Sequence, residues 1–404
     1  MSTSTVIVSF ARTPIGKFMG SLSSLTAPQL GATAIKGALS RAGGSIDVEE
    51  LPFTIAEAYM GNVVSAGIGQ APARQAVLAA GLPESTICTT INKVCASGMK
   101  SVMLGSQAIA AGSVGKDAAI LAGGMESMSN IPHYLPNSRG GTALGNIELV
   151  DGLVHDGLWD PYDNQHMGLC AEACAKDFSI SREEQDNYCI ESYRRAMEAM
   201  ESGYFEDEIV PVEIAQRRGD PLLVSEDEEP GALKLEKVPS LRPAFQKDGG
   251  TVTAANASSI NDGAAAMVLM REDSAKQFGL EPLARILGYG DAEQAPVEFT
   301  TAPAKAVPVA LKSAGMAATD VDYHEINEAF SVVALANMRL LNLDPTKVNV
   351  FGGAVALGHP IGCSGSRIVG NLYNVLKHSD ASIGCASICN GGGGASAIII
   401  ERLK

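Results

Sequence analysis

Cysteine, positive charge and long apolar runs are all scarce in this sequence. The 404 residues include eight cysteines, too few for a disulfide scaffold, and none has the Cys-x-x-Cys spacing with nearby histidines that a zinc site needs. The formal net charge is −15 at pH 7. Proteins that bind nucleic acids or membrane surfaces need an excess of lysine and arginine, so neither partner is expected. No apolar run reaches the roughly eighteen residues of a membrane-spanning helix, so none is expected.

Targeting signals are lacking as well. The N-terminus leads directly into the strand-like segment Val6 to Val8, without the features of a secretory signal or a transit peptide. The C-terminal segment Glu401 to Lys404 is not a peroxisomal signal. A cytosolic location is therefore expected by elimination.

Alternating strand and helix patterns fill most of the chain. Strands are predicted at residues 6–10, 56–63, 86–94, 117–122, 263–270 and 283–289, and helices at 28–42, 71–80, 97–111 and 182–202. This alternation predicts a layered α/β fold with right-handed crossovers. Because a single core stops growing at roughly 250–300 residues, more than one packed unit is expected.

Residues 125–258 differ in texture from the rest of the chain. They contain the only tryptophan, long polar loops and an acidic stretch from Glu226 to Glu229, which indicates an insertion or lid on the α/β frame. Residues 1–124, completed by about 259–279, would then form one α/β half, and residues 280–404 the other.

The two α/β parts resemble each other, which indicates an internal duplication. The segment 91–95 and the small-residue helix after it are echoed by 348–353 and a helix near 364–376. Likewise, 119–124 is echoed by 386–394. A strand, a reactive loop and a buried helix are thus predicted twice.

Cys95 lies between a predicted strand and a predicted buried helix, in the segment Asn92 to Met99. A helix N-terminus carries a partial positive charge and free N–H groups, which stabilise a thiolate. The small neighbours Ala96, Ser97 and Gly98 leave space for an acyl group. A buried structural cysteine is the alternative interpretation.

His359 lies on a glycine-dense loop, Gly352 to Gly365, just before a predicted helix. A histidine there is poorly placed for core packing and well placed to accept a thiol proton. A surface-loop histidine is the alternative. His166, in the segment Gln165 to Gly168, is a second candidate for lining a ligand cleft.

Cys389 and Asn327 complete the reactive set. Cys389 follows a predicted strand and precedes the glycine run Gly391 to Gly394, whose unobstructed N–H groups can stabilise an oxyanion. A phosphate cradle is the alternative, but the run lacks the Lys-Ser/Thr ending of a P-loop. Asn327 is a polar side chain in an apolar segment, where it would hold a water or cap a helix.

Four segments together resemble the signature blocks of the thiolase family. They are the Cys95 segment, Asn327 to Phe330, Gly358 to Pro360 and Cys389 to Gly391, in the family's order and spread over nearly the whole chain. Two further segments, 251–263 and 386–396, resemble the potassium-dependent acetoacetyl-CoA thiolases, which are acetyl-CoA C-acetyltransferases of the cytosolic type.

The resemblance implies a fold and a reaction. The fold would have five layers, α-β-α-β-α, built from two duplicated halves, with the inserted loop domain over the coenzyme A site. The protein would be a homotetramer, a dimer of tight dimers. It would condense two acetyl-CoA into acetoacetyl-CoA and free CoA, feeding sterol and isoprenoid synthesis through mevalonate.

The resemblance also implies a role for each reactive residue. His359 would take the proton of Cys95, which would carry the acetyl group, and Cys389 would deprotonate the second acetyl-CoA. His359 and a water on Asn327 would hold the enolate oxygen. The N–H groups of Cys95 and Gly391 would hold the oxyanion of the tetrahedral intermediate.

Ligand contacts are implied in the same way. The residues matched to coenzyme A binding are Tyr193, Leu233, Lys237, Ser258 and Met167, with His166 beside them. The residues matched to a potassium site are Tyr193 and the carbonyls of Ala254, Ala255, Ala257 and Val355. Two rival functions are a degradative 3-ketoacyl-CoA thiolase for longer chains and a catalytically silent module that binds acyl-CoA.

Overall fold

The structure is a computed structural model that describes residues 4–43, 51–141 and 144–403. Its main sheet runs in the order β14 (Tyr323–Ile326), β15 (Ile383–Asn390), β16 (Gly394–Arg402), β13 (Ala284–Glu293), β1 (Thr5–Arg12), β12 (Asn261–Arg271), β5 (Ala118–Ser127), β3 (Thr54–Gly61), β4 (Ile87–Ile91). The short strand β2 (Gly16–Lys17) pairs with β12.

This strand order is symmetric about the antiparallel pair of β1 and β13. Outward from β1 come β12, β5, β3 and β4, and outward from β13 come β16, β15 and β14. In each half the outermost pair of strands is parallel: β3 with β4 in one half, and β14 with β15 in the other. The predicted duplication is therefore visible in the sheet topology.

The expected strand at residues 348–353 is wrong. Only Val348 pairs there, through a single bridge to His324 in β14. This bridge lies at the edge position that the full strand β4 occupies in the other half of the sheet. The chain turns away because Asn349 adopts a left-handed conformation, with φ of 49°. Arg195 then binds the carbonyl of Val348 at 2.7 Å, which ends the ladder.

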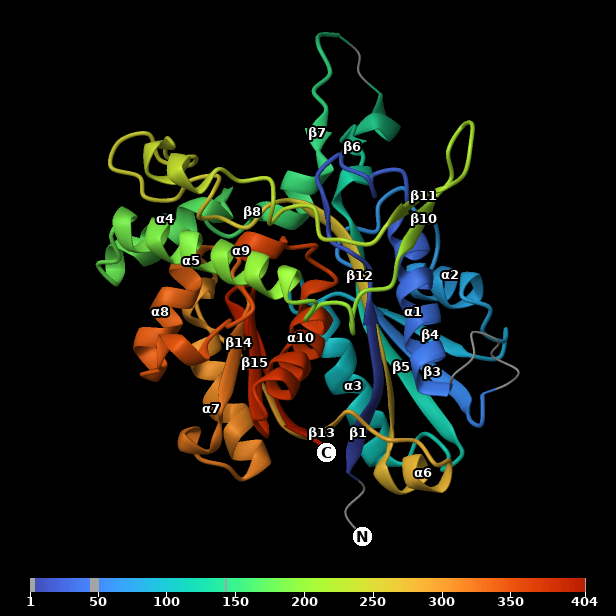
Figure 1. Ribbon diagram of the computed structural model, residues 1–404. Helices are drawn as coiled ribbons and strands as arrows, with labels where there is room; N and C mark the ends of the chain where they lie inside the picture. The colour runs from blue at the N-terminus through green and yellow to red at the C-terminus, as the bar shows by residue number, and fades with distance from the viewer. Residues whose placement is uncertain (1–3, 44–50, 142–143, 404) are drawn as a thin grey trace.

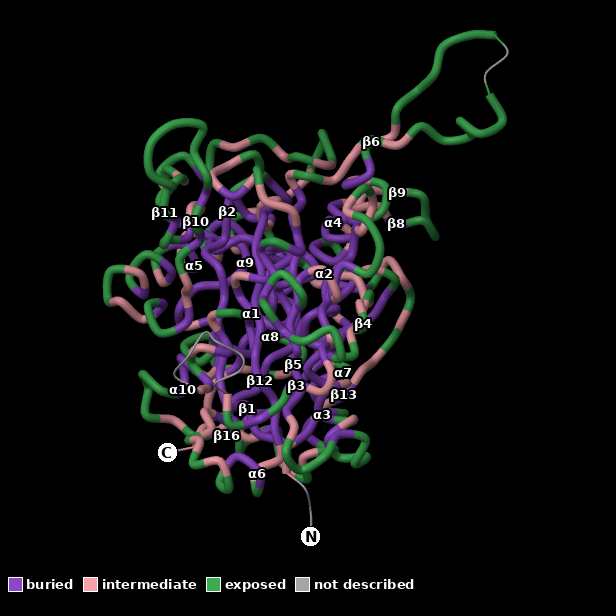
Figure 2. The backbone as a smooth tube through the Cα atoms, turned by 90° about the vertical axis from the view of Figure 1, so that its right-hand side faces the viewer, coloured by how far each residue is buried: buried purple, intermediate pink, exposed green. Residues whose placement is uncertain are grey.

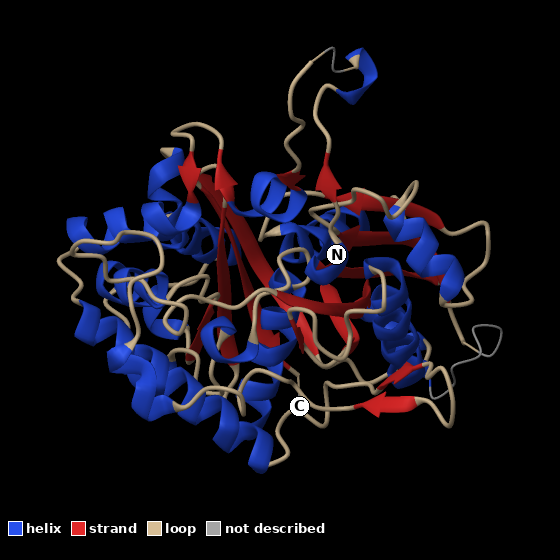
Figure 3. Ribbon diagram, turned by 90° about the horizontal axis from the view of Figure 1, so that it is seen from above, coloured by secondary structure: helices blue, strands red, loops and turns tan. Residues whose placement is uncertain are grey.

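Helices form three layers around and between the two halves of the sheet, as Figures 1 and 3 show. One outer layer holds α1 (Ala27–Gly43) and α2 (Pro72–Ala79), and the other holds α7 (Pro303–Ala314) and α8 (Ser331–Leu341). Between the sheet halves lie α3 (Ser97–Ala111) and α10 (Ser364–His378). The predicted five-layered arrangement is confirmed.

The central helices touch closely because their contact residues are small. A Cβ atom added to Gly98 would lie 2.7 Å from the backbone N of Ser366, and one added to Gly365 would lie 2.4 Å from the N of Met99. Real Cβ atoms do not approach so closely, so glycine is required here. Figure 2 shows this centre as the buried part of the molecule.

Strand β5 is longer than the predicted strand at 117–122. Gly123 and Gly124 do not end it, because they serve a close approach: an added Cβ would lie 2.2 Å from the carbonyl of Ala265 or 2.0 Å from that of Gly362. The extension places Glu126 directly beneath the loop that follows His359.

The region between β5 and β12 carries the remaining elements. Besides short helical turns, they include β6 (His133–Tyr134), β7 (Val150–Asp151), β8 (Trp159–Asp160), β9 (Gln165–His166), α4 (Met167–Asp177), α5 (Arg182–Glu201), β10 (Val212–Ile214), β11 (Leu222–Val224) and the 3-10 helix η5 (Leu235–Ser240). Two short helices lie outside it, α6 (Glu272–Gln277) and α9 (Ala354–Leu357). The segment between β6 and β7 projects from the molecule and is mostly exposed (Figures 1 and 2). The limits of the loop domain, 125–258, stay a prediction.

Candidate active site

Cys95 lies in a tight turn between β4 and α3. The preceding Val94 has a φ of 47°, which is unusual for a β-branched residue and indicates a strained turn. Ser97 holds the turn, because its hydroxyl accepts from the N–H of Lys93 at 2.8 Å and donates to the carbonyl of Val94 at 2.6 Å. The Lys93 side chain binds Asp291 of the other half at 2.6 Å. Both halves of the protein thus support the turn of Cys95.

A cavity of about 560 Å³ opens over this turn. Among the residues that line it are these candidates: Cys95, His166, Met167, Ala254, Ala257, Ser258 and His359. Its walls are mostly apolar, with aromatic side chains at Phe245, Phe299 and Phe330. Such a cavity is typical of a small-molecule site.

His359 is buried, and one of its ring nitrogens, Nε2, has no partner in the part of the chain that the structure describes. Its Nδ1 lies 2.6 Å from the hydroxyl of Ser364, and that hydroxyl donates its hydrogen to the carbonyl of Pro360 at 3.0 Å. Ser364 must therefore accept from Nδ1–H, which assigns the lone pair to Nε2. Burial, with a smaller effect of Arg367, lowers the pKa of His359 to about 3. The ring is thus a neutral proton acceptor.

The thiol of Cys95 is held in its neutral form at rest. Burial raises its pKa to about 12, although the N–H groups of Gly391 and of Cys95 itself act in the opposite direction. These two N–H groups face the sulfur, so they also lie where a reaction at the thiol would develop negative charge. A neighbouring cavity of about 520 Å³ is lined by Gly391.

Cys389 is fully buried at the end of β15. Burial and the nearby Cys95 hold the pKa of its thiol well above the ordinary value, which places the two thiols close together. Cys389 does not line the main cavity, whereas Met167 and Phe299 line both cavities beside it.

Asn327 follows β14 and is buried, with no partner for either polar atom of its side chain among the described residues. Helix α8 begins at Ser331 with Phe330 at its N-cap, so the helix-cap alternative for Asn327 is wrong. A buried amide without partners calls for a bound water or ligand.

The expected potassium ligands lie on neighbouring segments. Tyr193, Ala255 and Val355 belong to one cluster of buried side chains, and Leu233 packs against it. The Ala255 carbonyl accepts from the thiol of Cys189 at 3.0 Å. Carbonyl and phenol oxygens suit a hard cation.

Lys237 and Leu233 lie outside the cavity. Lys237 is exposed on η5, and Leu233 is half-buried just before it. Sequence reasoning missed Lys17 and Phe18, which line the cavity from β2. Nothing near them in the sequence signals a site, because only the pairing of β2 with β12 brings them there.

The fold, the two neighbouring thiols and the neutral histidine in the cavity of Cys95 define the class of protein: the chain belongs to the thiolase family. The model of the thiolase N-terminal domain matches residues 5–273, and that of the thiolase C-terminal domain matches residues 280–402.

Individual relatives are similar over their whole length. Acetyl-CoA acetyltransferase 1 of Arabidopsis thaliana is 56% identical over 98% of this chain and 94% of its own. The cytosolic acetyl-CoA acetyltransferase ERG10 of Gibberella zeae is 56% identical over 98% of both chains. The crystal structure of Acat5 thiolase from Ascaris suum in complex with coenzyme A has a TM-score of 0.91 at 48% identity, covering 99% of this chain and 100% of that one.

Proposed function

We propose that this thiolase is an acetyl-CoA C-acetyltransferase, which condenses two acetyl-CoA into acetoacetyl-CoA and CoA through an acetylated Cys95. The observation that carries this proposal is the cavity in which Cys95 lies with two N–H groups and a neutral His359. The names of the relatives support the choice of substrate.

Acyl transfer begins when Nε2 of His359 takes the proton of Cys95. The thiolate attacks the thioester carbonyl, and the N–H groups of Cys95 and Gly391 stabilise the oxyanion. The thiolate of CoA then leaves and takes a proton from Cys389. This half-reaction ends with acetyl-Cys95, a protonated His359 and a Cys389 thiolate.

Condensation uses the base that the first step has prepared. Because burial raises the pKa of Cys389, its thiolate is a strong base and removes a proton from the methyl carbon of the second acetyl-CoA. Protonated His359 and a water on Asn327 stabilise the enolate oxygen. The enolate carbon attacks acetyl-Cys95, and the leaving Cys95 thiolate recovers its proton from His359.

The phosphates of coenzyme A need local positive charge on a protein of net charge −15. Lys237 would supply it beside Leu233 at the outer end of the ligand, with Tyr193 in the buried cluster against which Leu233 packs. Ser258, Met167 and His166 line the cavity that holds Cys95. The structure of a relative with bound coenzyme A supports a site for that ligand.

Potassium would bind Tyr193 and the carbonyls of Ala254, Ala255, Ala257 and Val355. A bound monovalent cation supplies charge that holds these carbonyls together, and so orders the loops without entering the chemistry. Equal activity and equal CoA affinity in sodium and potassium buffers would remove this part of the proposal.

A homotetramer fits the exposed apolar surfaces, and a cytosolic location fits the name of one relative. Leu144 is 97% exposed on the projecting segment, and Ile87 is 62% exposed on the edge strand β4. Exposed apolar side chains and open strand edges are typical of interfaces. None of the described helices could span a membrane. One relative is named cytosolic, which favours a role in sterol and isoprenoid supply. Sedimentation of a monomer would contradict the tetramer.

The division of labour between the two thiols provides the test. Incubation with acetyl-CoA should add one acetyl group to Cys95 in wild type and, more slowly because the leaving CoA thiolate must take its proton from water, in Cys389→Ala. Cys389→Ala should form no acetoacetyl-CoA. Cys385→Ala is the matched control, because Cys385 is buried on the same strand away from the cavity. Absence of an acetyl adduct in the wild type would favour a silent module. Faster turnover of long ketoacyl-CoA than of acetoacetyl-CoA would favour the degradative thiolase.

A further inference from the structure

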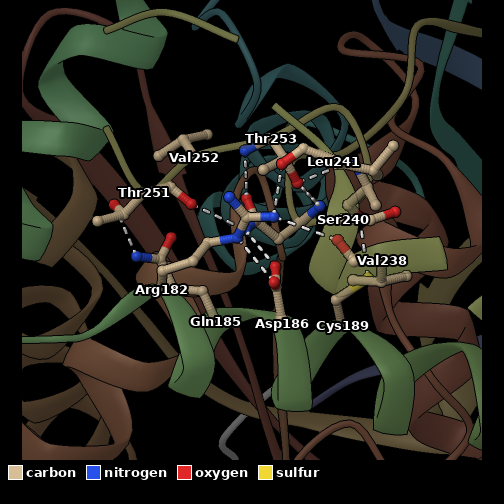
Figure 4. A network of polar contacts seen from close by, with 12 residues as sticks. Arg182, Gln185, Asp186, Cys189, Val238, Ser240, Leu241, Thr251, Val252 and Thr253 are labelled. Atoms are coloured by element: carbon tan, nitrogen blue, oxygen red, sulfur yellow. Dashed lines mark hydrogen bonds and ion pairs between the residues drawn. The ribbon is translucent and has the colours of Figure 1, made fainter. Parts of the chain in front are cut away.

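One face of α5 holds a wall of the substrate cavity by polar contacts. Arg182, Gln185, Asp186 and Cys189 have the spacing of residues that share a helix face, and in Figure 4 they point toward the same loop. That loop runs over residues 238–256, and no polar side chain of this face reaches the cavity itself.

The loop is a hairpin with one side in the cavity. Pro243 pairs with Thr253, and the N–H of Ala244 donates to the carbonyl of Val252 at 2.9 Å. Ala244, Phe245, Thr253 and Ala254 of the hairpin face the substrate space, as do Ala257 and Ser258 just after it. The position of this hairpin therefore sets one wall of the cavity.

Arg182 holds the incoming arm of the hairpin. Its Nη2 donates to the carbonyls of Val238 at 3.2 Å and Leu241 at 2.9 Å, while its Nε binds Asp186 at 2.7 Å. One guanidinium thus joins the helix to two carbonyls that follow Lys237. A lysine could not make these contacts together, because it is a single point charge on a flexible stem.

Asp186 holds the outgoing arm through Asn256. The Nδ2 of Asn256 donates to Asp186 at 2.9 Å and to the carbonyl of Thr251 at 3.0 Å, and its Oδ1 accepts from the N–H of Thr253 at 2.8 Å. Gln185 adds a bond to the hydroxyl of Thr251 at 2.9 Å. Asn256 and Gln185 are fully buried, so water cannot replace these bonds.

We propose that Arg182 and Asp186 act as one positioning unit that fixes both arms of the hairpin and thereby sets the affinity for coenzyme A thioesters. This inference rests on the proposed function and deepens it, since it concerns how the same cavity holds its substrate. Neither residue contacts Cys95 or His359. Their loss therefore acts on binding and leaves the proton-transfer groups unchanged.

The test compares Arg182→Gln, Asp186→Asn and the double variant with Arg194→Gln. Arg194 lies on the same helix, is 55% exposed and, among the described residues, pairs only with Glu191 and Glu198, so it is a matched control. Each single variant should weaken CoA binding in calorimetry, and raise KM for acetoacetyl-CoA, by about tenfold, the effect of losing a charged hydrogen bond. The value of kcat should stay within about twofold. The double variant should be no worse than the worse single variant, because the two residues share one unit.

Alkylation of Cys95 by iodoacetamide separates positioning from general damage. Its rate and pH profile should be the same in all folded variants. Unchanged CoA affinity in both single variants, or a shifted alkylation profile, would overturn the proposal. If Arg182→Gln does not fold, Arg182→Lys should show the same weakening of CoA binding to a smaller degree. A wild type without thiolase activity would contradict the proposed function instead, and the calorimetric comparison would still decide on these two residues.

Discussion

At the scale of the residue, the proton on the His359 ring decides which atom can act as a base. Ser364→Ala removes the acceptor of Nδ1–H and leaves that group buried without a partner. The tautomer with its lone pair on Nε2 is then no longer favoured. We expect kcat/KM to fall about 10- to 100-fold, the equivalent of one unsatisfied buried group.

The control for this change is Ser366→Ala. Ser366 is also buried, lies two residues after Ser364 and donates its hydroxyl to the carbonyl of Cys363 at 2.8 Å. Its loss should change stability but leave the rate within about twofold of wild type. Equal loss of activity in both variants would show that the Ser364 contact has no special role.

Lys17 is the residue that no sequence motif indicated, and it is the only lysine or arginine among the described residues that line the cavity. A lysine at this rim favours the phosphates of a CoA thioester. Lys17→Ala should raise KM for acetoacetyl-CoA about three- to tenfold, with less effect as salt rises.

Acetoacetyl-pantetheine, which lacks the nucleotide phosphates, provides the comparison for Lys17. Its KM should be the same in Lys17→Ala and wild type. Lys36→Ala serves as the control, because Lys36 is exposed on α1 away from the cavity. A matching rise in KM for both thioesters would argue against a phosphate contact.

At the scale of the element, sequence patterns predicted helices better than strand ends. Helix α3 has the predicted bounds, and α5 differs from its prediction by one residue, because periodicity and caps act locally. The strand predicted at 117–122 stops short of the end of β5, since two consecutive glycines favour a strand end, whereas contacts with distant segments require Gly123 and Gly124 here. Such contacts leave no local signal.

The crossing of α3 and α10 depends on glycine at one point. Gly98→Ala would place a Cβ 2.7 Å from the backbone N of Ser366, and backbone cannot shift cheaply. We expect a loss of about 1–3 kcal/mol in the free energy of unfolding, measured in urea. Gly115→Ala is the control, because its Cβ would meet nothing within 4 Å. Equal stability of the two variants would contradict this account of the helix contact.

At the scale of the whole molecule, the site joins segments from both halves, which sequence alone shows only as separate motifs. The thiols and His359 were predictable because each lies in a short, distinctive segment. Their supports were not. Asp291 contacts Lys93 from a distant strand and has no unusual local sequence. Asn261 lies in the distinctive segment 251–263, but nothing in that segment signals its contact with the N–H of His359.

Glu126 is the deepest link between the halves and gives a pH dependence. This fully buried carboxylate accepts from the N–H groups of Val63 and Gly362, at 2.9 Å each, and from Asn62 and Val64. Burial, against the effect of these donors, raises its pKa from an ordinary 4.5 to about 8.

Because folding raises this pKa, the stabilising contribution of the protonated carboxyl is fully present below pH 4.5 and is lost as pH rises through 8. The variant Glu126→Gln does not titrate at this site. The stability of wild type minus that of Glu126→Gln should therefore fall by a few kcal/mol between about pH 5 and pH 8 and then level off. Urea unfolding of both proteins across this range measures the difference directly, whatever constant offset the amide introduces. A difference that stays constant with pH would mean that the four donors outweigh burial and keep Glu126 ionised throughout, so that the joint between the halves is a permanent charge.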